Sequence, residues 1–131
     1  MAVADSRRRI GFTARFVKGV FMPNMKIFAD QAMGTETIKA LHAALPAMRA
    51  LLCDRLAVPL DLAQLAIVPV SGLADQAQFA VEMQILPKPE RTRESIVAAC
   101  EELRMVLRGI ADVKVAVRVT TVDPVNYLVM R

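Results

Sequence analysis

Two spacings of apolar residues alternate along the sequence, in the order strand, helix, strand and then the same order again. Apolar and polar residues alternate, as in a half-buried strand, over residues 22–30, 79–85 and 113–120, and residues 65–70 form a continuous apolar run. Between them, apolar residues recur every three or four positions over residues 38–56 and 96–110, which predicts two helices. We therefore expect an α/β (α+β) fold. Two βαβ units, each with parallel strands and a right-handed crossover, would form a four-stranded sheet with both helices on one face.

The first unit contains signals for where its elements begin and end. Thr35 is the expected N-cap of the first helix, and Val58-Pro59 ends the helical pattern. Pro46 lies within that pattern and predicts a kink or two abutting helical segments. The run over residues 65–70 is typical of a strand covered on both faces, and Pro69 indicates that it stops or reaches a sheet edge there.

The second unit carries corresponding signals. Thr92 is the expected N-cap of its helix, and Gly109 is expected to help close that helix. In the strand over residues 79–85, the apolar positions are expected to share one buried face: Phe79, Val81, Met83 and Ile85. The apolar tail over residues 127–130 has one interpretation as a last strand on a neighbouring subunit.

A sheet with both helices on one face leaves its other face uncovered. Several positions predicted to point outward there are apolar or small: Phe28, Ala66, Val68, Ala80 and Ala116. Apolar surface of this extent is usually buried against another molecule. The sequence therefore favours an oligomer that buries the uncovered face.

Composition excludes several classes of protein. The chain of 131 residues is 55% hydrophobic, which indicates one domain with a packed core, yet no apolar run approaches the roughly 18 residues that suggest a membrane span. Cys53 and Cys100 lie far apart without metal-like spacing and are read as reduced thiols, which points to the cytoplasm. With His42 as the one histidine, the sequence shows neither a metal site nor a Ser-His-Asp triad.

The net charge of +4 belongs to the first 21 residues. These carry five basic and one acidic side chain, and residues 22–131 carry twelve of each. We therefore divide the chain into a basic extension, 1–21, and a neutral domain, 22–131. Nucleic acid and membrane are disfavoured as partners, because the neutral domain offers no second contact surface for them.

Four interpretations of the extension stay open. It is upstream sequence preceding a true start at Met22, or an arm that adds a strand or stays flexible, or a targeting segment, or a nucleic-acid-binding arm. The arginines at positions 7–9 are not followed by the apolar region that a signal peptide needs, which argues against targeting.

The pair Met22-Pro23 opens the first predicted strand. If the methionine were removed, Pro23 would carry a secondary amine, which acts as a general base when burial keeps it unprotonated near neutral pH. With this pair, the helix leading to Val58-Pro59, and the stretch Glu90-Arg91-Thr92-Arg93-Glu94-Ser95, the domain resembles the tautomerase superfamily. Within it, residues 22–131 look most like 5-carboxymethyl-2-hydroxymuconate isomerases and, more distantly, macrophage migration inhibitory factor.

The resemblance implies a homotrimer without a cofactor, in which the amino-terminal proline shuttles a proton within a small carboxylate substrate. Pro23 would be the general base. A Gly-Arg-Ser-Leu-Glu-Ser stretch of the isomerases aligns with residues 90–95, so Arg91 falls on their substrate-binding arginine. Arg93 is a second candidate for substrate binding, and equally a solvated charge at a helix start. Gln64 falls where the isomerases place another arginine, and it can donate a hydrogen bond but adds no charge.

Three functions follow from these observations. The first is a cofactor-independent tautomerase or isomerase of an unsaturated 2-hydroxy or 2-keto acid, as in the catabolism of aromatic compounds, which requires a free Pro23 amine. The second is a non-catalytic oligomeric module whose extension binds a partner, which tolerates an amide at Pro23. The third is a basic-arm binder of nucleic acid or membrane, which requires salt-sensitive binding by the arginines of the extension.

Overall fold

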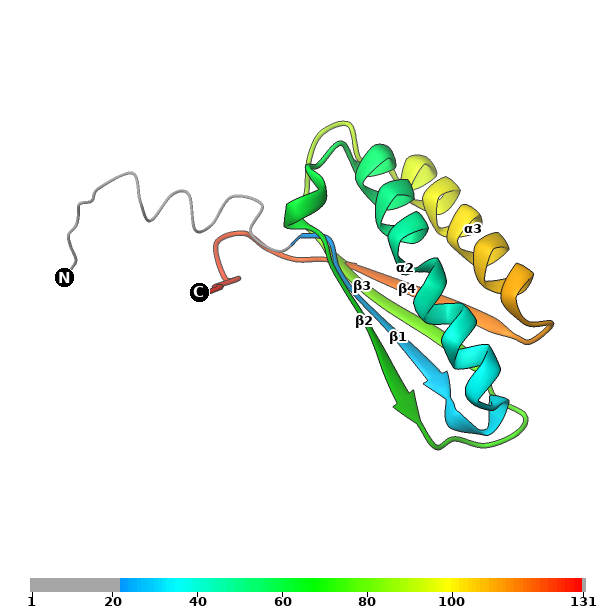
Figure 1. Ribbon diagram of the computed structural model, residues 1–131. Coiled ribbons are helices and arrows are strands. Elements are labelled where there is room, and N and C mark those ends of the chain that lie inside the picture. The colour runs from blue at the N-terminus through cyan, green and yellow to red at the C-terminus, as the bar shows by residue number, and fades with distance from the viewer. Residues whose placement is uncertain (1–21, 131) are drawn as a thin grey trace.

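The computed structural model describes residues 22–130, and the expectations for residues 1–21 lie outside this part of the chain. The sheet contains β1 (Asn24–Asp30), β2 (Gln64–Val70), β3 (Phe79–Ile85) and β4 (Val115–Thr121) in the order β2-β1-β3-β4. The helices α2 (Thr35–Leu56) and α3 (Arg93–Ile110) cover one face of it (Figure 1). Short 3-10 turns lie at Gln31–Met33 and Leu60–Leu62.

Strand pairing follows the predicted plan of two βαβ units. β1 pairs with β2 in parallel, β3 pairs with β4 in parallel, and the antiparallel pair of β1 with β3 joins the two units at the centre. The predicted fold class, a four-stranded sheet with two helices on one face, is therefore confirmed. In the described part of the chain, neither helix is long and apolar enough to cross a membrane.

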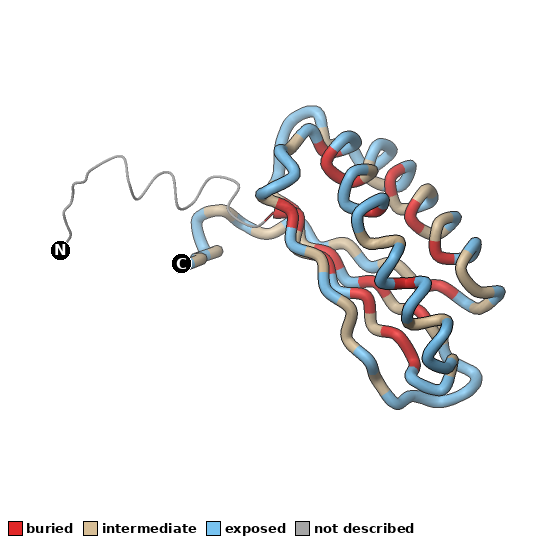
Figure 2. The backbone as a smooth tube through the Cα atoms, viewed as in Figure 1, coloured by how far each residue is buried: buried red, intermediate tan, exposed pale blue. Residues whose placement is uncertain are grey.

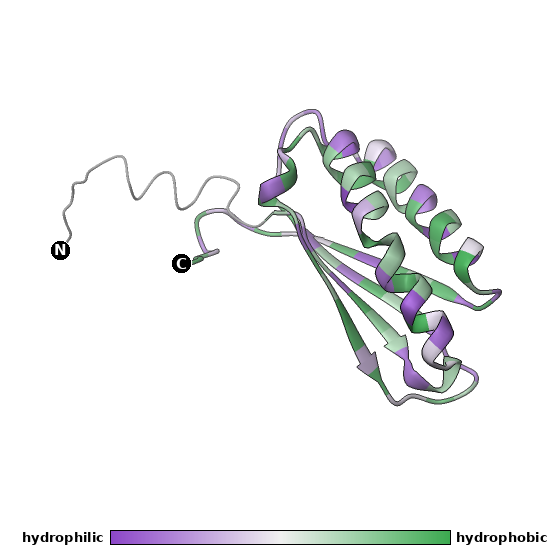
Figure 3. Ribbon diagram, in the orientation of Figure 1, coloured by the Kyte–Doolittle hydropathy of each residue, from purple (hydrophilic) through white to green (hydrophobic). Residues whose placement is uncertain are grey.

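The core lies between the sheet and the two helices (Figure 2). The four residues of β3 predicted to share a buried face, beginning at Phe79 and ending at Ile85, are at most 3% exposed, which confirms that prediction. Facing them are buried residues of the helices, including Leu41, Leu52 and Leu103. Hydrophobic and hydrophilic positions alternate along both helices and the strands in Figure 3, as expected for elements with one buried side.

Local signals at the helix ends were only partly predicted. The N-cap of α2 is Gly34, whose φ of 92° suits a residue without a side chain, so the prediction of Thr35 as the cap was wrong by one position. The helix runs through Pro46 as one continuous element rather than as two segments. It ends at Ala57, which takes a left-handed conformation with φ 56°.

The limits of α3 agree better with the prediction at its start than at its end. The Thr92 hydroxyl accepts a hydrogen bond from the Ser95 amide at 3.1 Å, which confirms Thr92 as the N-cap. Gly109 lies inside the helix, and Ala111 rather than the glycine is the cap residue, so the expected role of Gly109 was wrong. Residues 127–130 form no strand within the described chain, and the neighbouring-subunit interpretation remains a prediction.

The expectation that residues 65–70 form a strand covered on both faces was wrong. β2 is an edge strand, and Gln64, Ala66 and Pro69 are exposed on it, while Leu65 and Ile67 are half-buried under the helices. The physical reason is that both helices cover the same face, so an apolar strand at this edge has one covered side. Pro69 sits at the edge, as predicted, where its missing N–H costs no ladder bond inside the sheet.

The uncovered face carries residues in cross-strand rows. Phe28 lies in register with Val68 and Ala80, and Ala80 with Ala116, which forms the apolar row that the sequence predicted. The next row is charged, because Lys26 is in register with Glu82, and Glu82 with Arg118. These charged side chains help to line a polar hollow of about 330 Å³. The face is therefore apolar toward one end of the sheet and polar toward the other.

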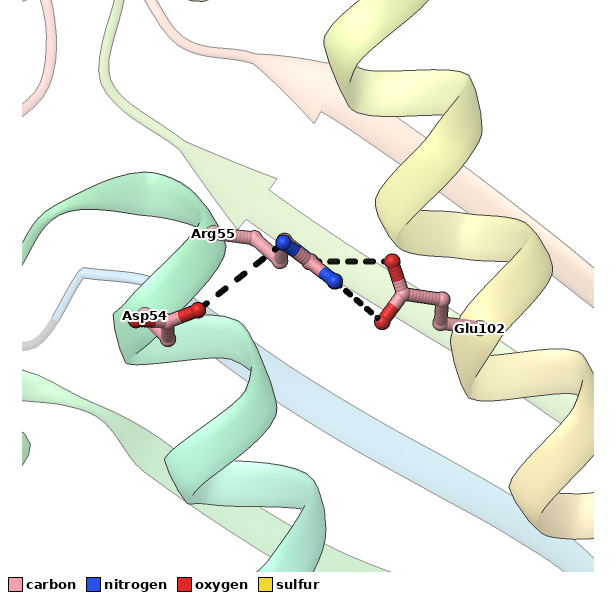
Figure 4. Close-up of polar contacts among 3 residues, drawn as sticks. All are labelled: Asp54, Arg55 and Glu102. Carbon is pink, nitrogen blue, oxygen red and sulfur yellow. Dashed lines mark hydrogen bonds and ion pairs between the residues drawn. The ribbon is translucent and has the colours of Figure 1, made fainter.

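A two-point ion pair joins the helices on the outer surface (Figure 4). Arg55 Nε lies 2.8 Å from Glu102 Oε2, and Arg55 Nη2 donates to Glu102 Oε1 at 3.0 Å. The hydrogen bond to Glu102, aided by its negative charge, raises the pKa of the Arg55 guanidinium. Because the arginine is exposed, solvent screens this pair, and we assign the adhesion of the helices to the apolar layer beneath.

Adjacent residues of α3 test this assignment. Leu103→Ala, at a fully buried position, should lower the free energy of unfolding by about 2–5 kcal/mol, because it leaves a cavity in the core. Glu102→Gln should lower it far less. Urea unfolding followed by circular dichroism measures both, and a larger loss for the Glu102 variant would contradict the assignment.

Candidate active site

Pro23 lies fully buried immediately before β1. Its carbonyl accepts a hydrogen bond from the Gln64 amide at 2.9 Å, which extends the pairing of β1 with β2 by one step. Met22 is also buried, with 2% of its surface exposed. While Met22 is attached, the nitrogen of Pro23 is a tertiary amide and has no basic lone pair. The position is held as a catalytic group would need to be, but the base is masked.

A cavity of about 430 Å³ adjoins this position. Met22 lines it, together with side chains from the connection after α2, from the segment after β3 and from the segment after β4, including Val58, Leu86 and Pro124. Its lining is mostly apolar, and its two charged residues are Lys88 and Arg91, both cationic. A cavity of this size and character accepts a small ligand that is partly apolar and carries negative charge.

Arg91 is fixed in this cavity by two backbone carbonyls. Its Nη1 donates to Leu86 O at 2.6 Å, and its Nη2 donates to Leu56 O at 2.7 Å. Leu56 is the last residue of α2, where carbonyls lack partners within the helix. The buried Nε has no partner among the described residues. Desolvation lowers the pKa of Arg91, opposed by the charge of Glu90. The guanidinium is thus tethered, and donors remain on it for a ligand.

Gln64 and Arg93 lie elsewhere in the single chain. The Gln64 amide bonds to Pro23, but its residue lines a different hollow of about 360 Å³, shared with Leu45 and Arg49. Arg93 begins α3 and lines a groove of about 820 Å³ along α3 and β4. Of the predicted site residues, the fold brings Arg91 to the cavity beside Pro23 and leaves the other two in separate hollows.

Two cationic residues near the site were not singled out from the sequence. Lys88 lies in a stretch that reads simply as a strand break, Pro87-Lys88-Pro89-Glu90, and its place in the cavity depends on the turn that follows β3. Arg49 falls off the apolar stripe of its helix, and only the packing of α2 beside β2 places it with Gln64. Pattern alone gives no signal for either position.

The remaining reactive groups lie outside this cavity. Burial raises the pKa of both cysteine thiols, Cys53 and Cys100, which keeps them protonated and poorly nucleophilic. Cys53 donates a weak hydrogen bond to Pro59 O at 3.7 Å. Within residues 22–130, no group of three or more His, Cys, Asp or Glu side chains could hold a metal ion.

Comparisons with known proteins bear on the fold. No protein-family model and no curated protein matches the sequence. Among solved structures, a fused 4-OT described as a symmetric trimer is 16% identical, with a TM-score of 0.60, over 76% of this chain and 85% of that one. The chain has the fold of the 4-OT structures. A malonate semialdehyde decarboxylase is 16% identical with a TM-score of 0.55, over 83% of this chain and 92% of that one.

A further match extends over more of the chain. A protein of unknown function from Vibrio cholerae O1 biovar eltor str. N16961 is 14% identical with a TM-score of 0.66, over 98% of this chain and 96% of that one. The domain 22–131 accounts for 110 of the 131 residues, or 84%, so this match reaches into residues 1–21. At these identities all three likenesses show the fold alone.

The tether of Arg91 predicts a structural effect that is separate from any activity. Arg91→Lys should lower the free energy of unfolding by about 1–2 kcal/mol, because one ammonium group cannot reach both Leu56 O and Leu86 O. Arg93→Lys, at an exposed position two residues away, is the matched control and should leave the free energy nearly unchanged. Chemical denaturation measures both, and equal stabilities would show that the two hydrogen bonds contribute nothing.

Proposed function

We propose that the domain 22–131, with Pro23 as its first residue, is a cofactor-independent tautomerase or isomerase of an unsaturated 2-hydroxy or 2-keto acid. The observation that carries this proposal is the cavity beside Pro23, where buried Met22 and tethered Arg91 share one lining. Loss of Met22 would convert the Pro23 amide into a secondary amine. It would also vacate the space that the methionine occupies next to a fixed cation.

The surroundings suit a proline base. Apolar residues such as Val58, Leu62 and Leu86 would desolvate the amine, and the positive charges of Arg91 and Lys88 oppose a further one. Both effects disfavour the ammonium form and would lower the pKa of the Pro23 amine. A neutral amine can take a proton from the substrate's enol oxygen or from one of its carbons. It then returns that proton to another carbon, so that the double bonds shift and no other reactant is consumed.

Arg91 would bind the substrate carboxylate. Its guanidinium already has a fixed orientation, so little side-chain freedom is lost on binding, and its planar donors match a carboxylate and the negative charge that develops on a dienolate. Gln64 and Arg93 line other hollows of the same chain. In this proposal they contact substrate only where a neighbouring copy brings them to the cavity. The narrower 5-carboxymethyl-2-hydroxymuconate isomerase activity would require the charge that Gln64 lacks to come from elsewhere.

The similar structures lend support through what they are said to be. One concerns a malonate semialdehyde decarboxylase in a form whose first-position proline is replaced by alanine. Another, Pt0534, is inactivated by 2-oxo-3-pentynoate, a 2-keto acid. Both have the fold of this chain. A cytoplasmic location and a role in the catabolism of aromatic compounds stay predictions.

One observation favours a second function, a non-catalytic module. The match to the Vibrio cholerae protein reaches into residues 1–21, and a chain that keeps this extension has an amide at Pro23. In that form the scaffold would serve assembly, with the extension as a partner-binding arm, and the cavity would stay closed by Met22.

Activity of two forms of the chain decides between these functions. Protein beginning at Pro23 should accelerate the ketonisation of phenylpyruvate or 2-hydroxymuconate, whereas protein of residues 1–131 should not, because its Pro23 nitrogen is an amide. Arg91→Ala in the shorter form should lower kcat/KM by the equivalent of about 2–4 kcal/mol. Intact mass identifies each form, and the mass from the native host tells which one occurs. Equal activity of both forms would rule out the proline mechanism.

We further propose a homotrimer, formed through the uncovered face of the sheet. Fused 4-OT structures with this fold are described as symmetric and asymmetric trimers. Sedimentation equilibrium of the 14.4 kDa chain should give three times the monomer mass at micromolar concentration. Phe28→Glu, which places a charge in the apolar row, should dissociate it. A stable monomer of the unmodified chain would contradict the trimer.

A further inference from the structure

Lys88 and Arg91 form a cationic pair on one short turn. The Arg91 amide donates to Lys88 O at 3.0 Å, which closes the turn after β3 and fixes the spacing of the two residues along the backbone. Both line the cavity of about 430 Å³ beside Met22. Glu90 lies between them in sequence but does not line the cavity, and no acidic residue among those described does. The cavity therefore holds two positive side chains and no negative one.

The two cations differ in how they are held. Arg91 is tied to the ends of α2 and β3 through two carbonyls, so its charge stays in place. Lys88 is exposed, and no hydrogen bond or ion pair within the described residues engages its ammonium. A lysine ammonium on a flexible chain can move to a second anionic group, whereas the fixed guanidinium sets the position of the first.

From this arrangement we propose that the cavity binds a small dianionic acid. One carboxylate binds at Arg91, a second anionic group pairs with Lys88, and the carbon chain between them contacts the apolar lining. A monoanion would compensate one charge and leave the Lys88 ammonium in water. A dianion compensates both, and charge-assisted pairing in a partly desolvated site strengthens its binding. Lys88 is thus a specificity-determining residue that selects substrates with two acidic groups. This inference rests on the site of the proposed function, but it concerns binding and does not depend on the Pro23 amine.

Fumarate and crotonate form a matched pair of probes, because both have four carbons and a trans double bond and they differ by one carboxylate. We expect the form that begins at Pro23 to bind fumarate at least about 10-fold more tightly than crotonate in isothermal titration calorimetry. Lys88→Gln should abolish this preference by weakening fumarate alone. Lys114→Gln is the control, since Lys114 binds Asp75 O near the start of β3, at the other end of that strand, and should keep the preference.

The outcomes separate this inference from the proposed function. A preference for fumarate that depends on Lys88, in protein that tautomerises nothing, would uphold the inference and remove the enzyme. Tautomerase activity with equal binding of both acids would do the reverse. Retention of the preference in Lys88→Gln would overturn the role of Lys88, as would failure of fumarate to bind at millimolar concentration.

Discussion

The antiparallel pairing of β1 with β3 determines where the chemistry of this molecule can lie. In that register Asn24 faces Gln84, so whatever precedes β1 packs against whatever follows β3. Parallel pairing of β1 with β2 brings the connection before β2 to the same end, and parallel pairing of β3 with β4 adds the segment after β4. Four segments that are distant in sequence therefore meet at one end of the sheet. The cavity beside Pro23 is the space between them, and Figure 1 shows this end of the sheet with the start of β1 and the chain after β4 side by side.

The sequence was sufficient for the sheet and the helices because their signals are periodic and repeated. The alternation in β3 and the stripe in α3 each extend over several turns or residue pairs, so no single position decides them. Positions that depend on one residue were less predictable. Gly34 rather than Thr35 caps α2, since the backbone there needs a positive φ. The apolar run of β2 resembles a central strand, and only the placement of both helices on one face makes it an edge.

Prediction of the site divides in the same way. Arg91 was found through a short motif shared with a known superfamily, and the fold does place it at the cavity beside Pro23. Lys88 was missed because a lysine between two prolines has no helical or strand pattern to mark it. The tether of Arg91 was also missed, because it requires the carbonyl of Leu56, which is 35 residues away. Tertiary contacts of this kind leave no trace in local spacing, so they become visible only with the fold.

The uncovered face connects the site to assembly. Its rows run from amides at the end near Pro23, through Lys26, Glu82 and Arg118, to an apolar row around Phe28. A second copy that covers this face would exclude water from the apolar row, and it would have to match the charged row, because an unpaired charge removed from water is costly. The amide row includes Gln64, whose backbone binds Pro23. Contact between copies would therefore press on the strand that holds Pro23 in place, and the geometry of a proline base would depend on the interface as well as on the single chain.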